Sequence, residues 1–338
     1  MMDVSVVIVC YNEERNLPDI LDSLVAQTYR HDHFEVLIVD NNSSDGTHRI
    51  AQEYAGCYDN FRVVKNPVQG IAPSRNVGLR EARHPYVAFT DADCVVPPDW
   101  LERLAEGYER YKPTMPTLVA VGGGNVAHDL DDPFLRSVAI TLNSFWGSHG
   151  STQGMLFEED VEVPHIPCLN ILYDRQAVLD AGGFDERFGN ICEDPELNHR
   201  LARSGRRMMF LHRATVRHKL RPDMTRWFKN VFTYGKGRSW LIRKHPDHFR
   251  VKFLAPPLMI LGFLLSPLGV LHWGFLVFPI AYVAGVVFLT SMLALRGDYL
   301  RGWFTILVIL ALNPIFYGLG QFHGAVRWPR AETNEPGS

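Results

Sequence analysis

Two aspartates separated by a single residue, Asp91-Ala92-Asp93, follow directly after the apolar run Tyr86–Thr90. Two carboxylates at the end of a strand can hold a hard divalent cation, and Mg²⁺ and Mn²⁺ both accept oxygen ligands. A cation held by so few carboxylates completes its shell with water and phosphate oxygens. Short acidic turns are also common on solvated surfaces, so this prediction depends on the elements that surround the pair.

Apolar runs alternate with helical patterns along the first ninety residues. The predicted strands are Val4–Val9, Glu35–Val39, Phe61–Lys65 and Tyr86–Thr90, with helical patterns from Leu17 to Gln27, from Thr47, and within 70–83. This alternation predicts an α/β fold with a mostly parallel, doubly wound sheet. Such sheets bind ligands at the carboxyl ends of their strands. Asn12, Asp40 and Asp91 each follow a predicted strand, so we expect them to meet at one crevice.

Six segments share their order and spacing with the motifs of a known family. They are Cys10-Tyr11-Asn12-Glu13-Glu14, Val39–Thr47, Gly70–Gly78, Asp91-Ala92-Asp93, Gly182-Gly183-Phe184-Asp185-Glu186 and Glu193–Leu201. Over roughly residues 4–240 the chain resembles the family 2 glycosyltransferases, including bacterial exopolysaccharide and glycolipid enzymes. The resemblance implies a GT-A fold and a hexosyltransferase that uses a nucleotide-sugar donor, either a UDP-sugar or a GDP-sugar.

The resemblance also implies roles on the donor side. Asp40 would accept a hydrogen bond from the nucleobase, with Tyr11, Asn12 and Glu13 close to the base or ribose. Asp40 has an alternative role as a turn-forming residue that stabilises its own loop. Arg75 would pair with the base or diphosphate through its guanidinium, or else be a solvated helix residue.

Asp91 and Asp93 would share the diphosphate site, with Asp93 the more direct metal ligand. A divalent metal, Mg²⁺ or Mn²⁺, stabilises the charge that develops on a leaving nucleoside diphosphate. His218 occupies a position where related enzymes place a further metal or phosphate contact. A histidine that follows an apolar stretch is also often structural, and both interpretations stay open.

Glu193 and Asp194 form the second chemical centre. By resemblance Asp194 is the base that takes the proton of an acceptor hydroxyl, and Glu193 is its neighbour or an acceptor contact. Both carboxylates also suit the start of a helix before Pro195, because the helix dipole favours negative charge there. A metal on the leaving group and a base on the opposite face predict transfer with inversion.

One segment departs from the pattern of processive family members, which carry Gln-x-x-Arg-Trp after the base. Here the segment is Asp223-Met224-Thr225-Arg226-Trp227, so we predict transfer of a single sugar. The following segment, Tyr234-Gly235-Lys236-Gly237-Arg238, resembles one found in enzymes that act on lipid-linked exopolysaccharide precursors. The residues assigned to the acceptor or lipid side are Arg226, Trp227, Tyr234, Lys236 and Arg238.

The favoured acceptor is a lipid-linked saccharide or a glycolipid, because a sugar hydroxyl needs a base whereas a phosphate nucleophile does not. A polyprenyl-phosphate glycosyltransferase similar to dolichyl-phosphate-mannose synthase is the alternative. A nucleotidyltransferase is a more distant alternative, because it also uses a metal-binding acidic pair on a similar sheet. Nucleic acid is rejected as a partner, since no fold signature for it is present.

Charge and hydropathy divide the chain. Residues 213–252 contain twelve Lys or Arg against two Asp, and Phe253–Leu295 and Gly302–Val326 contain no charged residue. These stretches have room for two membrane spans and one span respectively. The first apolar segment either spans or re-enters. The basic block before it predicts a cytoplasmic catalytic domain on a multi-pass protein of the inner, cytoplasmic membrane, with the tail outside.

The predicted organisation has four parts. A GT-A domain occupies 1–222, and basic aromatic interfacial helices that bind membrane lipids occupy 223–252. A membrane region of about three helices occupies 253–326, and a tail occupies 327–338.

Overall fold

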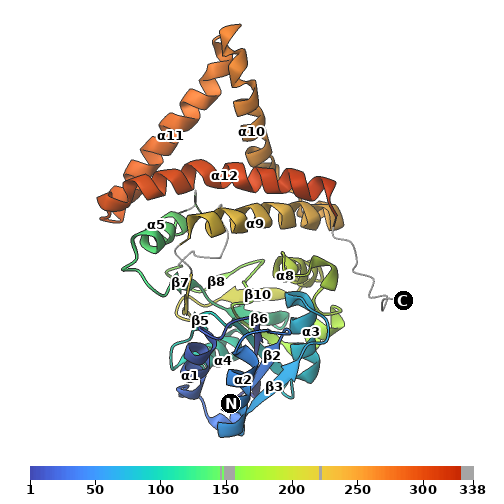
Figure 1. Cartoon of the computed structure of the whole chain (residues 1–338). Helices are drawn as coiled ribbons and strands as arrows, with labels where there is room; N and C mark the ends of the chain where they lie inside the picture. The colour runs from blue at the N-terminus through green and yellow to red at the C-terminus, as the bar shows by residue number, and fades with distance from the viewer. Residues whose placement is uncertain (145–146, 148–156, 221–222, 329–338) are drawn as a thin grey trace. The chain divides into compact units, whose positions relative to one another are not determined.

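The computed structural model describes residues 1–144, 147, 157–220 and 223–328, and the chain forms two compact units (Figure 1). The sheet unit comprises Met1–His128 and Ser151–Leu220, and the helical unit comprises Asp129–Gly150 and Arg221–Ser338. Residues 129–150 therefore group with the C-terminal helices. Most of the predicted tail, from residue 329 onward, lies outside the described residues.

The sheet unit is built on an eight-stranded sheet in the order β3-β2-β1-β4-β9-β6-β10-β8. Its strands are β1 (Val4–Cys10), β2 (Phe34–Asp40), β3 (Phe61–Lys65), β4 (Tyr86–Asp91), β6 (Leu118–Gly122), β8 (Val161–Glu162), β9 (Asn170–Asp174) and β10 (Arg207–Phe210). The first four are parallel, β9 runs antiparallel between β4 and β6, and β10 returns parallel to β6. The prediction of a mostly parallel sheet in an α/β fold is confirmed.

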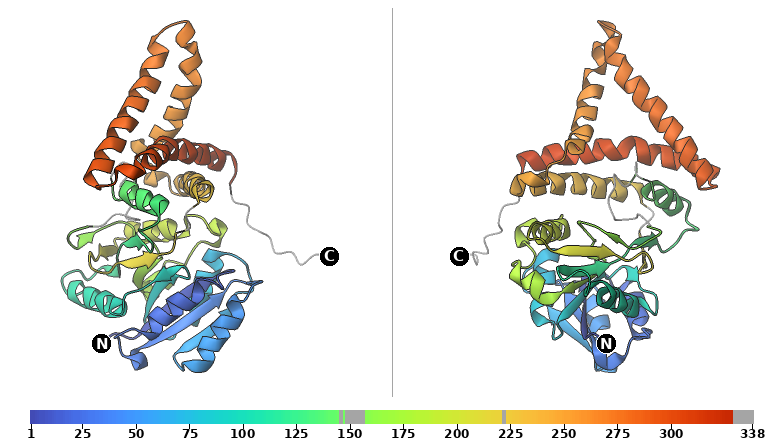
Figure 2. Two further views of the ribbon diagram at one scale, coloured as in Figure 1. Left: turned by 60° about the vertical axis from the view of Figure 1, so that its left-hand side comes forward. Right: turned by 180° about the vertical axis from the view of Figure 1, so that it is seen from behind.

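Helices cover both faces of this sheet (Figure 2). They are α1 (Leu17–Val25), α2 (Thr47–Cys57), α3 (Ile71–Glu81), α4 (Trp100–Tyr111), α7 (Arg175–Asp180) and α8 (Glu193–Arg203). Side chains alternate along β1, so Val6 and Ile8 join one apolar core while Val7 joins the other. A side chain at Gly78 would meet Val7 at 2.3 Å, so only glycine allows α3 to lie this close to β1.

A second, three-stranded sheet extends the same unit. Strand β11 (Val216–His218) lies between β5 (Cys94–Val95) and β7 (Asn125–Ala127). Its antiparallel register with β5 pairs His218 with Cys94, and the Lys219 N–H donates to the Asp93 carbonyl at 2.8 Å. The backbone therefore fixes His218 beside the acidic turn that follows β4.

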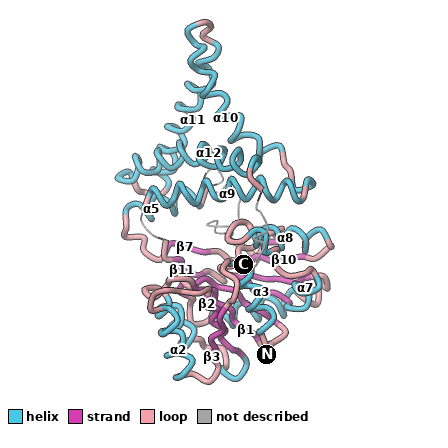
Figure 3. Tube along the Cα trace, turned by 45° about the vertical axis from the view of Figure 1, so that its right-hand side comes forward, coloured by secondary structure: helices cyan, strands magenta, loops and turns pink. Residues whose placement is uncertain are grey.

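The helical unit consists of helices and their connections (Figure 3). They are α5 (Pro133–Leu142), α9 (Met224–Lys244), α10 (Ala255–Leu265), α11 (Gly274–Arg296) and α12 (Trp303–Val326), with 3₁₀ turns η3 (Pro246–His248), η4 (Val251–Leu254), η5 (Ser266–Val270) and η6 (Leu300–Gly302). Among the described residues, three segments are long and apolar enough to cross a membrane: Val251–Val270, Gly274–Arg296 and Leu300–Val326.

Candidate active site

The carboxyl ends of the central strands bring the predicted polar residues to one edge of the sheet. In the register of β1 with its neighbours, Cys10 pairs with Asp40 on one side and Val9 with Asp91 on the other. The chain order reverses between β1 and β4, which is where ligands bind in open α/β sheets. The predicted convergence of strand ends is therefore present in the structure.

Asp93 and His218 face each other at this edge, with His218 Nε2 lying 3.2 Å from Asp93 Oδ2. Ligand atoms of Asp93, Cys94 and His218 all lie within 4.8 Å of one another. Within the part of the chain that the structure describes, the other ring nitrogen of His218, Nδ1, is buried without a hydrogen-bond partner. Carboxylate and imidazole donors suit a divalent metal such as Mn²⁺, so these residues fit the predicted cation.

The titratable groups at this edge of the sheet have shifted pKa values. Burial opposes a charge on His218, but the hydrogen bond and charge of Asp93, followed by the charge of Asp91, raise its pKa. Burial raises the pKa of Asp91, against the opposing charge of Arg75. Burial also raises the pKa of the Cys94 thiol. Perturbed titratable groups that lie close together are typical of functional sites.

Arg75 lies at the centre of the site. It is 5% exposed, so the alternative of a solvated helix residue is wrong. Its guanidinium donates to Asp91 Oδ1 at 3.3 Å and to Glu193 Oε1, and it lies 5.7 Å from the centroid of the Phe184 ring. Burial opposes its charge, but the negative charges of the neighbouring carboxylates Glu193, Asp91 and Asp194 raise its pKa. Arg75 therefore stays cationic and joins the β4 turn to α8.

Glu193 and Asp194 are the first residues of α8, which begins after Cys192 in a left-handed conformation with φ 65°. The Cys168 N–H donates to Asp194 Oδ2 at 3.1 Å, which orients that carboxylate. Burial raises the pKa of Glu193 to about 7, against the charge of Arg75. The Glu193 carboxylate is thus paired with the Arg75 guanidinium, whereas the Asp194 carboxylate accepts from the Cys168 N–H.

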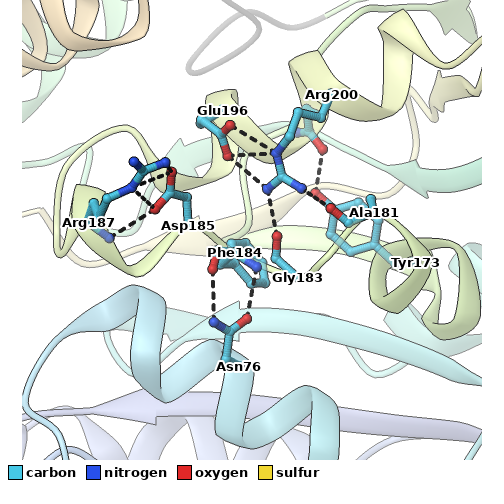
Figure 4. A network of polar contacts seen from close by, with 10 residues as sticks. Asn76, Tyr173, Ala181, Gly183, Phe184, Asp185, Arg187, Glu196 and Arg200 are labelled. Atoms are coloured by element: carbon cyan, nitrogen blue, oxygen red, sulfur yellow. Dashed lines mark hydrogen bonds and ion pairs between the residues drawn. The ribbon is translucent and has the colours of Figure 1, made fainter. Parts of the chain in front are cut away.

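A polar network that the sequence did not reveal holds the loop before α8 in place (Figure 4). The side chain of Asn76 donates to the Phe184 carbonyl at 2.9 Å and accepts from the Phe184 N–H at 2.8 Å. Arg200 of α8 pairs with Glu196 at 2.8 Å and donates to the carbonyls of Ala181 and Gly183. The loop is therefore fixed from α3 and from α8 at once.

A third side chain anchors α8 itself. The Tyr173 hydroxyl of β9 donates to Asn198 Oδ1 at 2.6 Å, and Asn198 donates to the Ile166 carbonyl at 2.8 Å. Asn198 is fully buried, so these bonds have no competition from water. The polar contacts of α8 link two segments that the sequence analysis had singled out, 182–186 and 193–201.

The predicted nucleobase residues lie on two adjoining loops. The Asn12 N–H donates to Ser43 Oγ at 3.0 Å, and the Ser44 N–H donates to Asn12 Oδ1 at 2.8 Å, so Asn12 ties the loops together. Asp40 is buried, and its Oδ1 accepts from the Ser43 N–H at 3.0 Å. Its turn-forming contact is therefore present, and its base-reading role stays a prediction.

The neighbouring residues differ in exposure. Tyr11 is 45% exposed at the end of β1. The Glu13 N–H donates to Thr47 Oγ1 at 2.7 Å, and its Oε2 accepts from Asn16 Nδ2 at 2.7 Å. Asn41, which the sequence did not single out, accepts from the Gly70 N–H at 2.9 Å and so positions the start of α3.

The residues predicted for the acceptor side all lie on α9, in the helical unit. Trp227 donates to Asn313 at 2.9 Å, Arg238 donates to the Tyr317 hydroxyl at 3.2 Å, and Lys236 lies 4.5 Å from the centre of the Trp240 ring. Arg226 lies in the first turn of α9, and Tyr234 is half exposed. These contacts are internal to the helical unit, so an acceptor role for them stays a prediction.

Asp223, the residue that departs from the processive motif, has a structural role. Its Oδ1 accepts from the N–H groups of Thr225 at 2.9 Å and Arg226 at 3.2 Å, and so caps α9. Aspartate is among the best residues for such a cap, which accounts for its presence at this position.

Comparison with curated proteins shows related enzymes. The chain is 30% identical over 266 residues to glycosyltransferase AglE of Haloferax volcanii, covering 78% of this chain and 82% of AglE. It is 28% identical over 250 residues to the glucosyl-dolichyl phosphate glucuronosyltransferase of the same organism, covering 71% and 73% of the two chains. It is also 28% identical over 247 residues to the succinoglycan biosynthesis protein ExoA of Rhizobium meliloti, covering 71% and 70%.

Solved structures share the fold. The mannosyltransferase PcManGT of Pyrobaculum calidifontis, solved with GDP-Man and Mn²⁺, aligns with a TM-score of 0.60 at 20% identity, covering 95% of this chain and 87% of that one. TarS 1–349 of S. aureus, solved with UDP-GlcNAc, aligns with a TM-score of 0.53 at 17% identity, covering 95% and 93%. The model of glycosyl transferase family 2 matches residues 5–181. With the GT-A-like fold and the acidic cluster described above, this match shows that the chain belongs to glycosyl transferase family 2.

Proposed function

We propose that this glycosyltransferase is anchored in a membrane and transfers one sugar, with inversion, from a nucleotide-sugar donor to a lipid-linked saccharide or glycolipid. The reaction would take place at the cytoplasmic face of the inner membrane. Family membership favours this function over the nucleotidyltransferase alternative. Three apolar segments that could cross a membrane support the anchored location.

The observation that carries the proposal is the position of Arg75. One buried guanidinium contacts Asp91, on the predicted diphosphate side, and Glu193, on the predicted base side. The two chemical centres are therefore separated by the width of a single side chain. A donor diphosphate and an acceptor hydroxyl bound at these centres would be close enough to react.

On the donor side, Asp93 and His218 would hold a divalent metal, with Asp91 next to them. When bound, the metal would act as a Lewis acid that stabilises charge on the leaving diphosphate. Arg75 contributes a fixed positive charge at the same edge, already oriented by its two carboxylate partners. The loops of Tyr11–Glu13 and Asp40 would bind the nucleoside.

On the acceptor side, Asp194 would take the proton of the attacking hydroxyl. The hydroxyl oxygen forms a bond to the anomeric carbon while the bond from that carbon to the diphosphate oxygen breaks. The leaving group carries away the electron pair as a nucleoside diphosphate. The Cys168 N–H orients the carboxylate that receives the proton. Attack from the face opposite the leaving group inverts the anomeric configuration.

The names of two relatives support the acceptor class. One is the glucosyl-dolichyl phosphate glucuronosyltransferase named above. Another, from Methanococcus voltae, is 22% identical over 302 residues and is named dolichyl N-acetyl-α-D-glucosaminyl phosphate 3-β-D-2,3-diacetamido-2,3-dideoxy-β-D-glucuronosyltransferase. Both names describe transfer to a sugar already attached to a polyprenyl phosphate lipid. A sugar hydroxyl needs a base, so this acceptor agrees with an oriented Asp194 better than a bare polyprenyl phosphate does.

The proposal is tested by nucleoside diphosphate release from the full chain purified in detergent. UDP- and GDP-sugars are offered with Mg²⁺ or Mn²⁺, with and without a lipid extract. We expect release of nucleoside diphosphate from one donor, and this release should require both metal and lipid. Mild acid should cleave the labelled product more readily than an ordinary glycoside, and the product should carry the new sugar at its outer end. A product in which the new sugar is joined directly to phosphate would support the polyprenyl-phosphate alternative. Absence of release with every donor would contradict the proposal.

A further inference from the structure

Helices α9 and α12 run side by side in the same direction within the helical unit (Figure 1). Contacts recur along both helices, from the Trp227–Asn313 hydrogen bond at one end to the Trp240–Arg327 hydrogen bond of 2.6 Å at the other. Between them Ser239 donates to the Gln321 carbonyl at 2.8 Å. About the last four turns of α12, from Asn313 onward, are therefore attached along most of α9.

The two helix backbones touch, because glycine occupies the crossing points. A side chain at Gly235 would lie 2.0 Å from the Tyr317 carbonyl oxygen, and one at Gly320 would lie 2.0 Å from that of Phe232. Gly324 approaches the Lys236 carbonyl in the same way, at 2.5 Å. Contacts this close do not allow one helix to change its depth in a membrane without the other.

Helix α9 cannot enter the hydrocarbon core. It carries six cationic side chains, Arg226, Lys229, Lys236, Arg238, Arg243 and Lys244, and no acidic one. Each charge at the centre of a bilayer disfavours insertion on the order of 100-fold. A helix of this composition lies at the interface, where its cations meet anionic headgroups and its aromatic side chains pack against acyl chains.

We propose that α12 lies along the membrane interface with α9, and that only the segments containing α10 and α11 cross the bilayer. This inference concerns the anchoring of the chain and goes beyond the proposed activity. It replaces a topology of three spans with one of two spans. The end of α12 is then on the same side of the membrane as the sheet unit, because only two residues of sequence separate Leu220, the last residue of that unit, from Asp223, the cap of α9.

The arrangement of the other helices agrees. Segments α10 and α11 converge at residues 271–273, and α12 passes across their opposite ends (Figures 1 and 2). At one end Gln321 donates to the Phe253 carbonyl at 3.0 Å, next to the start of α10. At the other end Leu293 and Ala294 of α11 pack against Ile306. Helix α12 thus links the two ends of a helical hairpin.

The exposed surface of the hairpin suits a lipid bilayer. Its tip is apolar or aromatic, with Val270 90% exposed and Trp273 72% exposed. Helix α11 has 23 residues and so is about 34 Å long, slightly more than the hydrocarbon core. Arg296 ends α11, which places positive charge on the side that carries α9. On α12 only one stripe, Leu319, Phe322 and Val326, is apolar and exposed near its C-terminal end.

The topology is tested by cysteine labelling of the full chain in cells with a membrane-impermeant maleimide, with the labelled position identified by peptide mass. The exposed native Cys57 marks the side of the sheet unit. Ser338→Cys reports the end that follows α12, and His272→Cys reports the hairpin tip. We expect Ser338→Cys to react only after permeabilisation, together with Cys57, and His272→Cys to react in intact cells. Reaction of Ser338→Cys in intact cells, or failure of His272→Cys to react in them, would overturn the proposal.

A pair of matched substitutions gives an independent test. Phe288 of α11 is 68% exposed and Leu319 of α12 is 42% exposed, so a lysine at either position disturbs little internal packing. We expect Phe288→Lys to lower the amount of membrane-inserted protein by at least about 10-fold, because it puts a charge near mid-bilayer. Leu319→Lys should lower it less than about 2-fold, since its ammonium reaches headgroups. An equal loss for both variants would contradict an interfacial α12.

Discussion

Arg75 of α3 and Glu193, the first residue of α8, form a buried ion pair that joins two helices 118 positions apart in sequence. Each partner is less than one-tenth exposed. A buried charge of this kind is tolerated only while its partner is present. The pair therefore fixes the start of α8, and with it Asp194, relative to the acidic turn after β4.

Replacing Arg75 by glutamine should lower the unfolding free energy of the sheet unit by more than a substitution of a surface arginine would. The variant leaves the Glu193 carboxylate buried without a cation, and we expect a loss of about 3–5 kcal/mol in unfolding free energy. Pulse proteolysis of the detergent-solubilised chain across a urea series measures this loss. The double variant Arg75→Gln, Glu193→Gln should recover part of the stability but no transfer. A loss below about 1 kcal/mol in the single variant would contradict the structural role.

Asp194→Asn should abolish most transfer while it preserves the fold. Asparagine keeps an oxygen for the Cys168 N–H but cannot take a proton, so we expect turnover to fall about 10²–10⁴-fold. Nucleotide binding should stay within about 2-fold of the unchanged protein, because the base does not contact the donor diphosphate. The exposed Asp180, which accepts from Gln176, supplies the matched control Asp180→Asn, expected to be fully active. Retained turnover in Asp194→Asn would remove the base assignment.

Four strands of the sheet unit, β1, β2, β3 and β4, were predictable because each is an apolar run between turn-rich or helical segments. The predicted Phe61–Lys65 matches β3, and the predicted Val4–Val9 is one residue shorter than β1. Gly123, which follows β6, lies in a tight passage of backbone, since a side chain there would lie 1.7 Å from the Ala214 carbonyl oxygen.

The burial of Arg75 was not predictable, because it depends on α8, which lies more than a hundred residues away. The same holds for Asn76 and Arg200, whose partners are backbone groups of a loop with no periodicity. Local sequence contains the turn chemistry of Asp40, yet it cannot show which polar residues a distant helix encloses. The burial of Arg75 and the partners of Asn76 and Arg200 therefore became known only from the tertiary contacts.

Removing the candidate metal ligands should weaken nucleotide binding only when metal is present. We expect Asp93→Asn and His218→Gln to weaken Mn²⁺-dependent binding of a nucleoside diphosphate at least about 10-fold, because each removes one of few donors. Titration calorimetry with and without a chelator measures the difference. His212→Gln is the control, since His212 pairs with Asp160 outside this cluster. Equal nucleotide affinity before and after chelation in the unchanged protein would contradict the metal site.

The carboxylate of Glu35 should make the stability of the sheet unit dependent on acid pH. Burial alone would raise its pKa, but hydrogen bonds from the Arg83 N–H, the Ser5 hydroxyl and Arg62 lower it below its usual value of 4.5. A lowered folded-state pKa adds stability above 4.5 that is lost as pH falls through the folded-state pKa.

We therefore expect Glu35→Gln to lower the unfolding free energy by about 2 kcal/mol at pH 7, and this difference to disappear progressively as pH falls below 4.5 through the lowered folded-state pKa. Pulse proteolysis at several pH values provides the measurement. Glu53, 57% exposed and paired with Arg49, gives the matched control Glu53→Gln, which should change stability by less than about 0.5 kcal/mol. A difference for Glu35→Gln that does not change with pH would rule out the carboxylate charge as its cause.

Asn76 should act as a positioning residue for the predicted active site. Its side chain makes two hydrogen bonds to the backbone of Phe184, whose ring lies beneath the Arg75 guanidinium. In Asn76→Ala these buried backbone groups lose their partners, so we expect a loss of about 2–4 kcal/mol in stability. At temperatures where the variant stays folded, turnover should fall while nucleotide affinity changes little, because Arg75 loses its support on the base side.

Asn76→Asp should not restore turnover, since a carboxylate cannot donate to the Phe184 carbonyl. Gln176→Ala removes a surface hydrogen bond of α7 and should leave both quantities unchanged. Full turnover in Asn76→Ala would show that the loop keeps its position without this contact.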